Sequence, residues 1–274
     1  VSTEWLAAQM DEPGVKVLDA SWHMPAANRD AKAEFQAAHI PGARFFDIDG
    51  IAQPGTDLPH MAATPAQFAD AVGRLGVAAS DTIVVYDSAG LFSAARAWWN
   101  FRIMGAANTF VLDGGLPKWQ AEGRPVSNQI APVRPSVFNP VPLAGGIVEA
   151  PEIRDLLNRG AAQIVDVRPA PRFRGEVAEP RAGLRSGHMP GARNLPFAEL
   201  IEDGRLANSE RLSAAIAKAG IDPHKPLVTS CGSGVTAPLF NLALAQLGID
   251  SMRVYDGSWT EWGGRDDLPV VTGG

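Results

Sequence analysis

The only cysteine of this chain, Cys231, has the sequence context of a reactive thiol. It follows the strand-like run 226–230 and opens the loop 231–236, Cys-Gly-Ser-Gly-Val-Thr, after which a helical pattern continues to Leu247. Glycines let such a loop curl so that its N–H groups point inward, and a helix N-terminus carries partial positive charge. Both features favour the thiolate, so we predict that Cys231 is a nucleophile rather than a buried structural cysteine.

The sequence of the same loop also limits which chemical group it could bind. Cysteine-based phosphatases place an arginine at the end of this kind of loop, where the present chain has Ala237. Without that guanidinium the loop lacks a bidentate clamp for phosphate oxygens. We therefore expect it to receive a smaller group, such as the outer sulfur of a persulfide.

Composition excludes several classes of protein. The chain has 274 residues, of which 46% are hydrophobic and 20% charged, and this length accommodates two domains. The formal net charge is −6 and no basic block occurs, which argues against a nucleic-acid partner. No apolar run has the length of a membrane span, so we expect no membrane association. A single cysteine excludes an internal disulfide and a cysteine metal cluster, which favours a cytoplasmic location.

Motifs recur in the same order in the two halves of the chain. The matching pairs are 15–19 with 163–168, 39–43 with 188–192, 82–87 with 226–231, and 111–119 with 254–262. Ordered matches at a nearly constant offset indicate tandem duplication. In the first copy Asp87 stands at the position of Cys231, so we predict that this copy has no nucleophile.

The elements around these motifs predict the fold class. Short β-branched runs alternate with helical patterns in each copy, which is typical of an α/β domain with a mainly parallel sheet and helices on both faces. A proline-rich stretch separates the copies and predicts an extended linker. We place the first domain at 1–124, the linker at 125–145 and the second domain at 146–274.

This arrangement resembles the rhodanese family of sulfurtransferases over nearly the whole chain. The resemblance rests on the tandem repeat, the first copy without a nucleophile and the single loop cysteine, and it implies two rhodanese-like domains. Members that use thiosulfate typically carry Cys-Arg-Lys-Gly-Val-Thr in this loop. The form present here, 231–236, is found in members that act on 3-mercaptopyruvate.

The resemblance also implies a reaction cycle. Cys231 would take the sulfur of 3-mercaptopyruvate, a small-molecule donor, as a persulfide and release pyruvate. A thiol acceptor, such as thioredoxin or a small thiol, or cyanide, would then take that sulfur. This cycle uses no metal and no organic cofactor.

The family match assigns further residues to the site. In the stretch 172–183, Arg172 and Arg181 would hold the carboxylate and keto oxygen of the substrate, for which a planar guanidinium is suited. Judged by spacing alone, both arginines could instead form surface ion pairs with Glu176 and Glu179. The loop residues that would line the donor site are Gly232, Gly234, Val235 and Thr236.

A relay is implied next to the nucleophile. Ser233 would connect through His60 to Asp49, and such a set could protonate the enolate of the departing pyruvate. His60 and Asp49 lie in the first half of the chain, so the relay would explain why an otherwise inert copy is retained.

Other polar residues recur in both copies and are interpreted as structural. His39 and His188 belong to a repeated His-x-Pro-Gly-Ala turn, where the imidazole is expected to satisfy backbone groups. Asp19 and Asp166 recur at predicted strand ends.

Three alternative functions remain open at this stage. A thiosulfate sulfurtransferase would handle a dianion, for which Gly232 and Ser233 supply no cation. A non-catalytic sulfur carrier or interaction module is the second alternative, although many rhodanese-like domains have lost the cysteine and this chain keeps it. A cysteine hydrolase would use Cys231 with His60 and the loop amides as an oxyanion hole.

Overall fold

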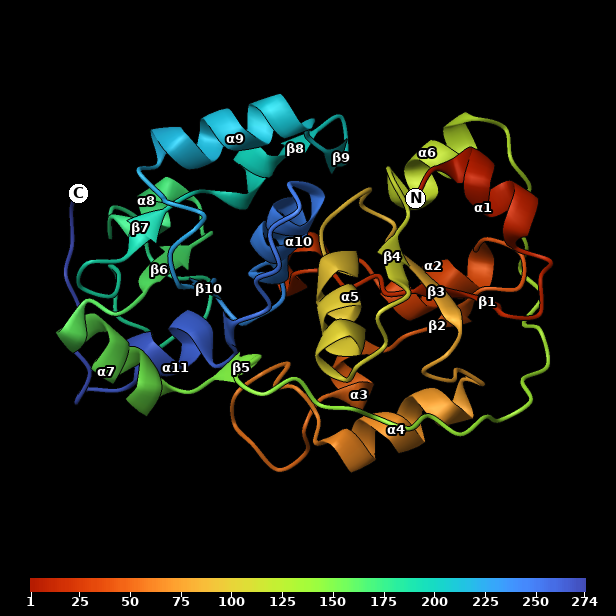
Figure 1. Ribbon diagram of the computed structural model, residues 1–274, viewed down its shortest axis with the longest axis horizontal. Helices are drawn as coiled ribbons and strands as arrows, with labels where there is room; N and C mark the ends of the chain where they lie inside the picture. Colours follow the sequence, from red (N-terminus) through yellow and green to blue (C-terminus); the bar gives the residue numbers. More distant parts are fainter. The chain divides into compact units, whose positions relative to one another are not determined.

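The computed structural model describes residues 1–274, which group into two compact units (Figure 1). The first unit comprises Val1–Pro54, Ala62–Leu143 and Asp203–Leu206, and the second comprises Gly55–Met61, Ala144–Glu202 and Ala207–Gly274. The segment that carries His60 therefore groups with the second unit although it comes early in the sequence. The boundaries 1–124, 125–145 and 146–274 remain a proposal.

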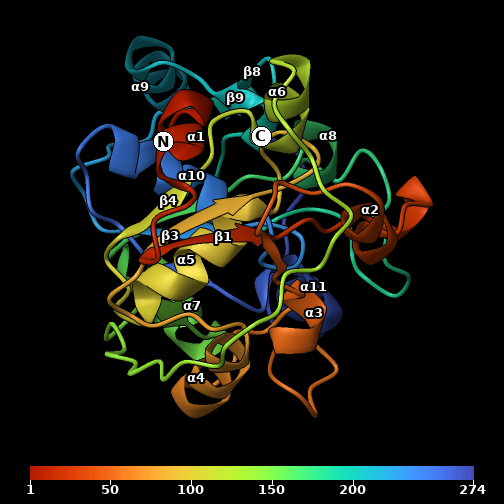
Figure 2. The ribbon, with the colours of Figure 1, turned by 90° about the vertical axis from the view of Figure 1, so that its right-hand side faces the viewer.

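The first unit is built on a parallel sheet. Its strands are β1 (Val15–Asp19), β2 (Arg44–Phe45), β3 (Thr82–Tyr86) and β4 (Thr109–Val111), in the order β2-β1-β3-β4. Its helices are α1 (Thr3–Gln9), α2 (Ala31–Ala37), α3 (Ile48–Ile51), α4 (Pro65–Arg74), α5 (Ala94–Ile103), α6 (Gly115–Ala121) and the short 3-10 helix η1 (Pro25–Ala27). Figure 2 shows α1 and α6 on one side of this sheet and α4 and α5 on the other.

The strands of the first unit are apolar because both faces of the sheet are covered. Val17 of β1 and Val84 and Tyr86 of β3 pack in one cluster with Leu6 of α1 and Trp119 of α6. On the other face, α5 packs on β3 and β4. A parallel sheet buried on both faces needs nearly continuous apolar strands, which is the pattern that revealed them in the sequence.

The second unit repeats this plan. Its strands are β5 (Ile147–Val148), β6 (Gln163–Asp166), β7 (Arg193–Asn194), β10 (Leu227–Ser230) and β11 (Val254–Tyr255), all parallel in the order β5-β11-β10-β6-β7. Its helices are α7 (Ala150–Arg159), α8 (Ala170–Phe173), η2 (Phe197–Leu200), α9 (Ser209–Lys218), α10 (Pro238–Gln246) and α11 (Ser258–Gly264). Two further short strands are β8 (Ile201–Glu202) and β9 (Arg205–Leu206), the latter in the segment that groups with the first unit.

The duplication extends to single hydrogen bonds. The amide of Ala20 donates to the Tyr86 carbonyl at 2.8 Å, and the amide of Val167 donates to the Ser230 carbonyl at 2.9 Å. Each bond ties the loop after a strand to the end of the neighbouring strand. Together with the two parallel sheets, this agreement confirms the predicted α/β class with two similar domains.

The repeated histidines satisfy backbone groups, as predicted. His39 Nδ1 donates to the Phe35 carbonyl at 2.7 Å, and His188 Nδ1 donates to the Phe173 carbonyl at 2.8 Å. Each imidazole also stacks on the phenyl ring of the same partner, with ring centroids 4.2 Å and 3.7 Å apart. Phe35 and Phe173 are therefore equivalent residues of the two units.

The proline-rich stretch 125–143 forms no helix or strand, as expected, but it is not loose. Within the first unit, the Ser136 amide donates to the Gly73 carbonyl and the Val141 amide donates to the Met104 carbonyl, both at 2.9 Å. These bonds hold the extended chain along α4 and the end of α5. No helix of the structure is both long and apolar enough to cross a bilayer.

Candidate active site

Cys231 lies at the carboxyl edge of the second sheet, between β10 and α10. Cys231 is 2% exposed, and the amide of Gly234 donates to its Sγ at 3.1 Å. Gly234 has φ +82°, a conformation that strains any residue with a Cβ. This glycine therefore turns a backbone N–H onto the sulfur.

The other loop residues predicted from the sequence follow Cys231 directly along the chain. Ser233, Val235 and Thr236 are all buried, and their amides donate to no protein acceptor. Unpaired amides are costly when buried, unless they serve a ligand. The loop therefore has further N–H donors without a protein acceptor, beyond the one that already contacts Sγ.

The start of α11 fixes the backbone of this loop. Ser258 Oγ accepts from the Cys231 amide at 3.2 Å, and the Trp259 amide donates to the Cys231 carbonyl at 3.0 Å. Thr260 donates to the Gly232 carbonyl twice, from its amide at 2.9 Å and from its hydroxyl at 2.7 Å. The N–H and the carbonyl of Cys231 are thus both hydrogen-bonded to residues outside the loop.

Ser258 is a residue that the sequence analysis missed. It has φ +50°, which costs a residue other than glycine about 1–3 kcal/mol. Its hydroxyl is buried, donating to the Tyr255 carbonyl at 2.8 Å while accepting from Cys231. The only signal in the sequence was comparative, since the first copy has Gly115 at this position.

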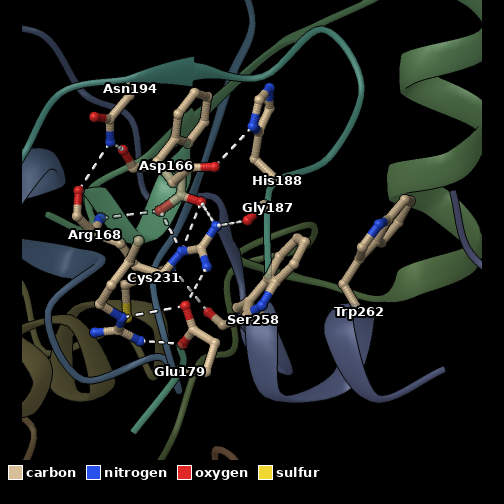
Figure 3. A network of polar contacts seen from close by, with 12 residues as sticks. Asp166, Arg168, Glu179, Gly187, His188, Asn194, Cys231, Ser258 and Trp262 are labelled. Carbon is tan, nitrogen blue, oxygen red and sulfur yellow. Dashed lines mark hydrogen bonds and ion pairs between the residues drawn. The ribbon is translucent and has the colours of Figure 1, made fainter. Parts of the chain in front are cut away.

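A buried charge network lies beneath the loop (Figure 3). Arg168 is 1% exposed and donates to Asp166 from Nε at 2.9 Å and from Nη2 at 2.6 Å. Its Nη1 donates to Glu179 at 2.8 Å, its Nη2 donates to the Gly187 carbonyl at 2.8 Å, and its guanidinium lies 4.2 Å from the centre of a Trp259 ring. Burial alone would lower the pKa of Arg168, but the two carboxylates outweigh it and raise that pKa.

Arg172 connects this network to the loop. It donates to Glu179 from Nε at 3.2 Å and also from Nη2. A Cβ at Gly232 would lie 3.1 Å from Arg172 Nη2, so the guanidinium lies directly against the loop that carries Cys231. The Glu179 pairing considered from the sequence does occur, but the Glu179 side chain is 1% exposed, so the pair is not a surface one. Glu176 instead pairs with Arg174.

Arg181 and His60 also come together in the second unit. Arg181 Nη2 lies 3.4 Å from His60 Nε2, and because a guanidinium can only donate, Nε2 is the acceptor in this contact. His60 has φ +61°, a strained conformation of the kind that clusters at functional sites. Two residues assigned to different roles thus form one cluster.

Asp49 belongs to the first unit. Its carboxylate accepts from Trp22 Nε1 at 3.0 Å, and both residues line a cavity of about 360 Å³ together with His23. The geometry within this unit places Asp49 on an open, polar surface. Its part in a relay with Ser233 and His60 remains a proposal.

The first unit shows what the loop can hold. Asp87 stands at the position of Cys231, and the same number of residues separates each of them from the following helix, α5 or α10. The Asp87 carboxylate accepts from the amides of Phe92, Ser93 and Ala94 at 2.7 to 2.9 Å. A loop of this shape therefore binds an anion through its backbone.

Comparisons with known proteins agree with this geometry. The rhodanese-like domain model matches residues 2–122 and 149–265. The chain is 41% identical to a 3-mercaptopyruvate sulfurtransferase of Escherichia coli K12, covering 98% of this chain and 96% of that protein. It is 39% identical to a thiosulfate sulfurtransferase of Cricetulus griseus, covering 96% and 91%.

A solved structure of the same kind also matches. The crystal structure of a 3-mercaptopyruvate sulfurtransferase from Escherichia coli superimposes with a TM-score of 0.87 at 38% identity, covering 94% of this chain and 98% of that one. Two family domains and full-length relatives at this level of identity leave no other assignment. The chain therefore belongs to the rhodanese family of sulfurtransferases, as an enzyme of the group that contains the 3-mercaptopyruvate sulfurtransferases.

Proposed function

We propose that this enzyme transfers the sulfur of 3-mercaptopyruvate to an acceptor thiol through a persulfide on Cys231. The observation that carries the proposal is the thiol itself, which receives the Gly234 N–H at 3.1 Å within a loop that Arg172 touches at Gly232. A donor that carries both a sulfur and a carboxylate fits this arrangement, because a nucleophile and a cation are adjacent.

In the first half-reaction, the Cys231 thiolate attacks the sulfur of 3-mercaptopyruvate. A sulfur–sulfur bond forms and the carbon–sulfur bond breaks, so the bonding electron pair leaves with carbon as the enolate of pyruvate. That enolate takes up a proton and leaves as pyruvate. The cysteine now carries the outer sulfur as a persulfide.

In the second half-reaction, an acceptor thiolate attacks the outer sulfur. The sulfur–sulfur bond to the enzyme breaks and its electron pair returns to Cys231 as the thiolate, while the acceptor leaves as a persulfide. A small thiol or thioredoxin would serve, and cyanide would leave as thiocyanate. The loop amides of Ser233, Val235 and Thr236 are available to stabilise the charge on the terminal sulfur in between.

The arginines and the relay have separate roles in this proposal. Arg172 and Arg181 hold the carboxylate and the keto oxygen of the substrate. His60, with Asp49 and Ser233, supplies the proton to the enolate. The contact of Arg181 with His60 supports a common site for the keto oxygen and for proton delivery.

Thiosulfate is the second candidate donor, because a relative at 39% identity is a thiosulfate sulfurtransferase. Thiosulfate is a dianion, and its reaction would gain from cations in the loop. Here the loop has Gly232 and Ser233, which supply no cation. We therefore place thiosulfate below 3-mercaptopyruvate.

Mass spectrometry of the intact enzyme tests the proposal. After 3-mercaptopyruvate alone, the protein should gain the mass of one sulfur atom and release one equivalent of pyruvate, and an acceptor thiol should remove the added mass. Cys231→Ser is the matched control, because the chain has no other cysteine that could carry the sulfur. Turnover by Cys231→Ser would overturn the proposal, and higher kcat/KM with thiosulfate under the same acceptor would reverse the order of the donors.

A further inference from the structure

In the second unit, the side chain of Arg168 fills a defined space. Its guanidinium lies between the Asp166 carboxylate, the Gly187 carbonyl and the indole ring of Trp259. The Arg168 amide also donates to Asp166 Oδ1 at 2.9 Å, which fixes the backbone from which the side chain starts.

The first unit reproduces the walls of this space. The Ser21 amide donates to Asp19 Oδ1 at 2.9 Å, so Asp19 and Ser21 stand where Asp166 and Arg168 stand in the second unit. Ala38 precedes His39 as Gly187 precedes His188. The Leu116 amide donates to the Asp87 carbonyl at 3.0 Å, as the Trp259 amide does to the Cys231 carbonyl, so Leu116 takes the place of the indole.

Serine is too short to fill the space, and the first unit has a cavity there. The cavity has a volume of about 260 Å³ and is lined by Asp19, Ser21, Ala38 and Leu116. Further lining residues are Arg29, Glu34, Phe35, Ala37, Ser88, Pro117 and Gln120. One water molecule occupies about 30 Å³ in the liquid, so this cavity has room for a guanidinium and a short stem.

The groups in this cavity are arranged for a cation. Asp19 is 1% exposed and makes no ion pair, whereas its equivalent Asp166 pairs with Arg168. The Ala38 carbonyl accepts no hydrogen bond, whereas the equivalent Gly187 carbonyl accepts one from Arg168. Burial raises the pKa of Asp19, against the hydrogen bonds of Ser21 and Tyr86 that lower it, as expected for a carboxyl without a positive partner.

The remaining charges of the cavity do not supply that partner. Arg29 donates to Glu34 from Nε at 2.6 Å and from Nη2 at 2.7 Å, so its charge is already balanced. Asp19 and Glu34 together carry more negative charge than Arg29 offsets. Phe35 and Leu116 add apolar walls on which the stem of a ligand could pack.

We propose that the first unit binds the guanidinium or amidinium group of a small molecule in this cavity, with the Asp19 carboxylate and the Ala38 carbonyl as acceptors. The ligand would occupy the place that Arg168 occupies in the second unit. A planar cation with several N–H donors matches a carboxylate and a carbonyl in this geometry. The proposal is independent of the sulfur-transfer reaction.

Methylguanidine is the probe for this site, with methylammonium as the probe of equal charge and different shape. Isothermal titration of the whole enzyme should show saturable binding of methylguanidine to one site, with methylammonium at least about tenfold weaker. In Asp19→Asn and in Ser21→Arg this binding should fall by at least about tenfold. Ser21→Arg supplies the guanidinium from the chain itself, as Arg168 does.

A matched control separates occupancy of the cavity from added charge. Ser209→Arg places the same side chain on an exposed residue of the second unit, and it should bind methylguanidine as the wild type does. Turnover with 3-mercaptopyruvate reports that each variant is folded. Absence of saturable binding by the wild type would overturn the proposal, and so would binding that persists in Ser21→Arg. Equal binding of methylammonium would also overturn it, because the shape of the site would then play no part.

Discussion

The loops after β3 and β10 are equivalent in length and position, but they differ in what occupies them. In the first unit the loop closes on its own Asp87, whose carboxylate takes three amides near the start of α5. In the second unit a short thiol, Cys231, stands at that position. The amides of Thr236 and Ala237 correspond to two of the three and donate to no protein acceptor, whereas Pro238 stands at the third position and has no N–H. Loops of equal length thus bind an internal carboxylate in one copy and hold a thiol in the other.

The residues around the loops differ in charge as well. Because Phe35 and Phe173 are equivalent, Glu34 of the first unit stands at the position of Arg172. Glu34 contacts the Ser88 hydroxyl at 3.3 Å, in the first-unit loop, whereas Arg172 rests on Gly232. In the second unit a cation therefore lies against the loop at Gly232, whereas in the first unit both Glu34 and its ion-pair partner Arg29 contact the Ser88 hydroxyl, the latter from Nη2 at 3.2 Å. The two copies thus differ in the charged residues around the loop as well as in the loop residue itself.

The largest effect should come from trying to move the nucleophile. Asp87→Cys in a Cys231→Ser background should give no persulfide and no turnover, because Glu34 stands where Arg172 would attract an anionic donor, and Arg29 is already paired with Glu34. Intact mass after 3-mercaptopyruvate measures this. A persulfide on the introduced cysteine would break the comparison, by showing that the shape of the loop is sufficient.

The next effect concerns the stability of the second unit. Asp166→Asn should lower the free energy of unfolding by about 3–5 kcal/mol, since it leaves the buried Arg168 with only Glu179 as a charged partner. Urea denaturation followed by fluorescence measures it. The double variant Asp166→Asn with Arg168→Met is the control and should recover much of the loss. An unchanged midpoint in Asp166→Asn would show that Glu179 alone balances the charge.

A smaller effect separates function from stability at Ser258. Ser258→Gly should lower kcat/KM by about tenfold, which corresponds to the loss of one hydrogen bond to the Cys231 amide. The same change relieves the positive φ, so the melting temperature should not fall. Ser258→Ala keeps the strained backbone and should lower both kcat/KM and the melting temperature. Parallel losses of activity and stability in Ser258→Gly would mean that the hydroxyl is structural only.

The smallest effect concerns Asp19 and has the opposite sign to Asp166. Burial raises the pKa of Asp19 above the ordinary 3.8, so the folded protein binds a proton that the unfolded chain has already released. Stability is therefore lost as pH rises above 3.8 through the folded pKa. Asp19→Asn removes this loss, and its unfolding free energy should exceed that of the wild type at pH 7 but not below pH 3.8. Chemical denaturation at the two pH values measures the difference, and an advantage that persists at the lower pH would contradict it.

Much of the candidate site could be predicted because its residues are neighbours in the sequence. The loop 231–236 lies between a strand and a helix, so its position at a sheet edge followed from three adjacent patterns. The duplication was equally readable, because apolar strands and Pro-Gly turns keep their spacing when a domain is copied. Arg172 and Arg181 were named by resemblance, and nothing in their spacing distinguished them from a surface pair.

Other parts of the site depend on contacts between distant segments. Ser258 accepts from the Cys231 amide, and Glu179 accepts from both Arg168 and Arg172. No sequence pattern around Ser258 or Glu179 predicts these contacts. The Asp19 cavity likewise follows from the short side chain of Ser21, which matters only once the surrounding residues are brought together by the fold.

The sequence by itself determined the two α/β copies and the position of Cys231 in a loop between a strand and a helix, because these follow from periodicity and from neighbours along the chain. Only the tertiary structure decided which charges are buried together and which hydroxyl holds the cysteine peptide. The physical reason is that the energy of a buried charge or hydrogen bond depends on partners brought together by the sheet, and those partners are far apart in sequence.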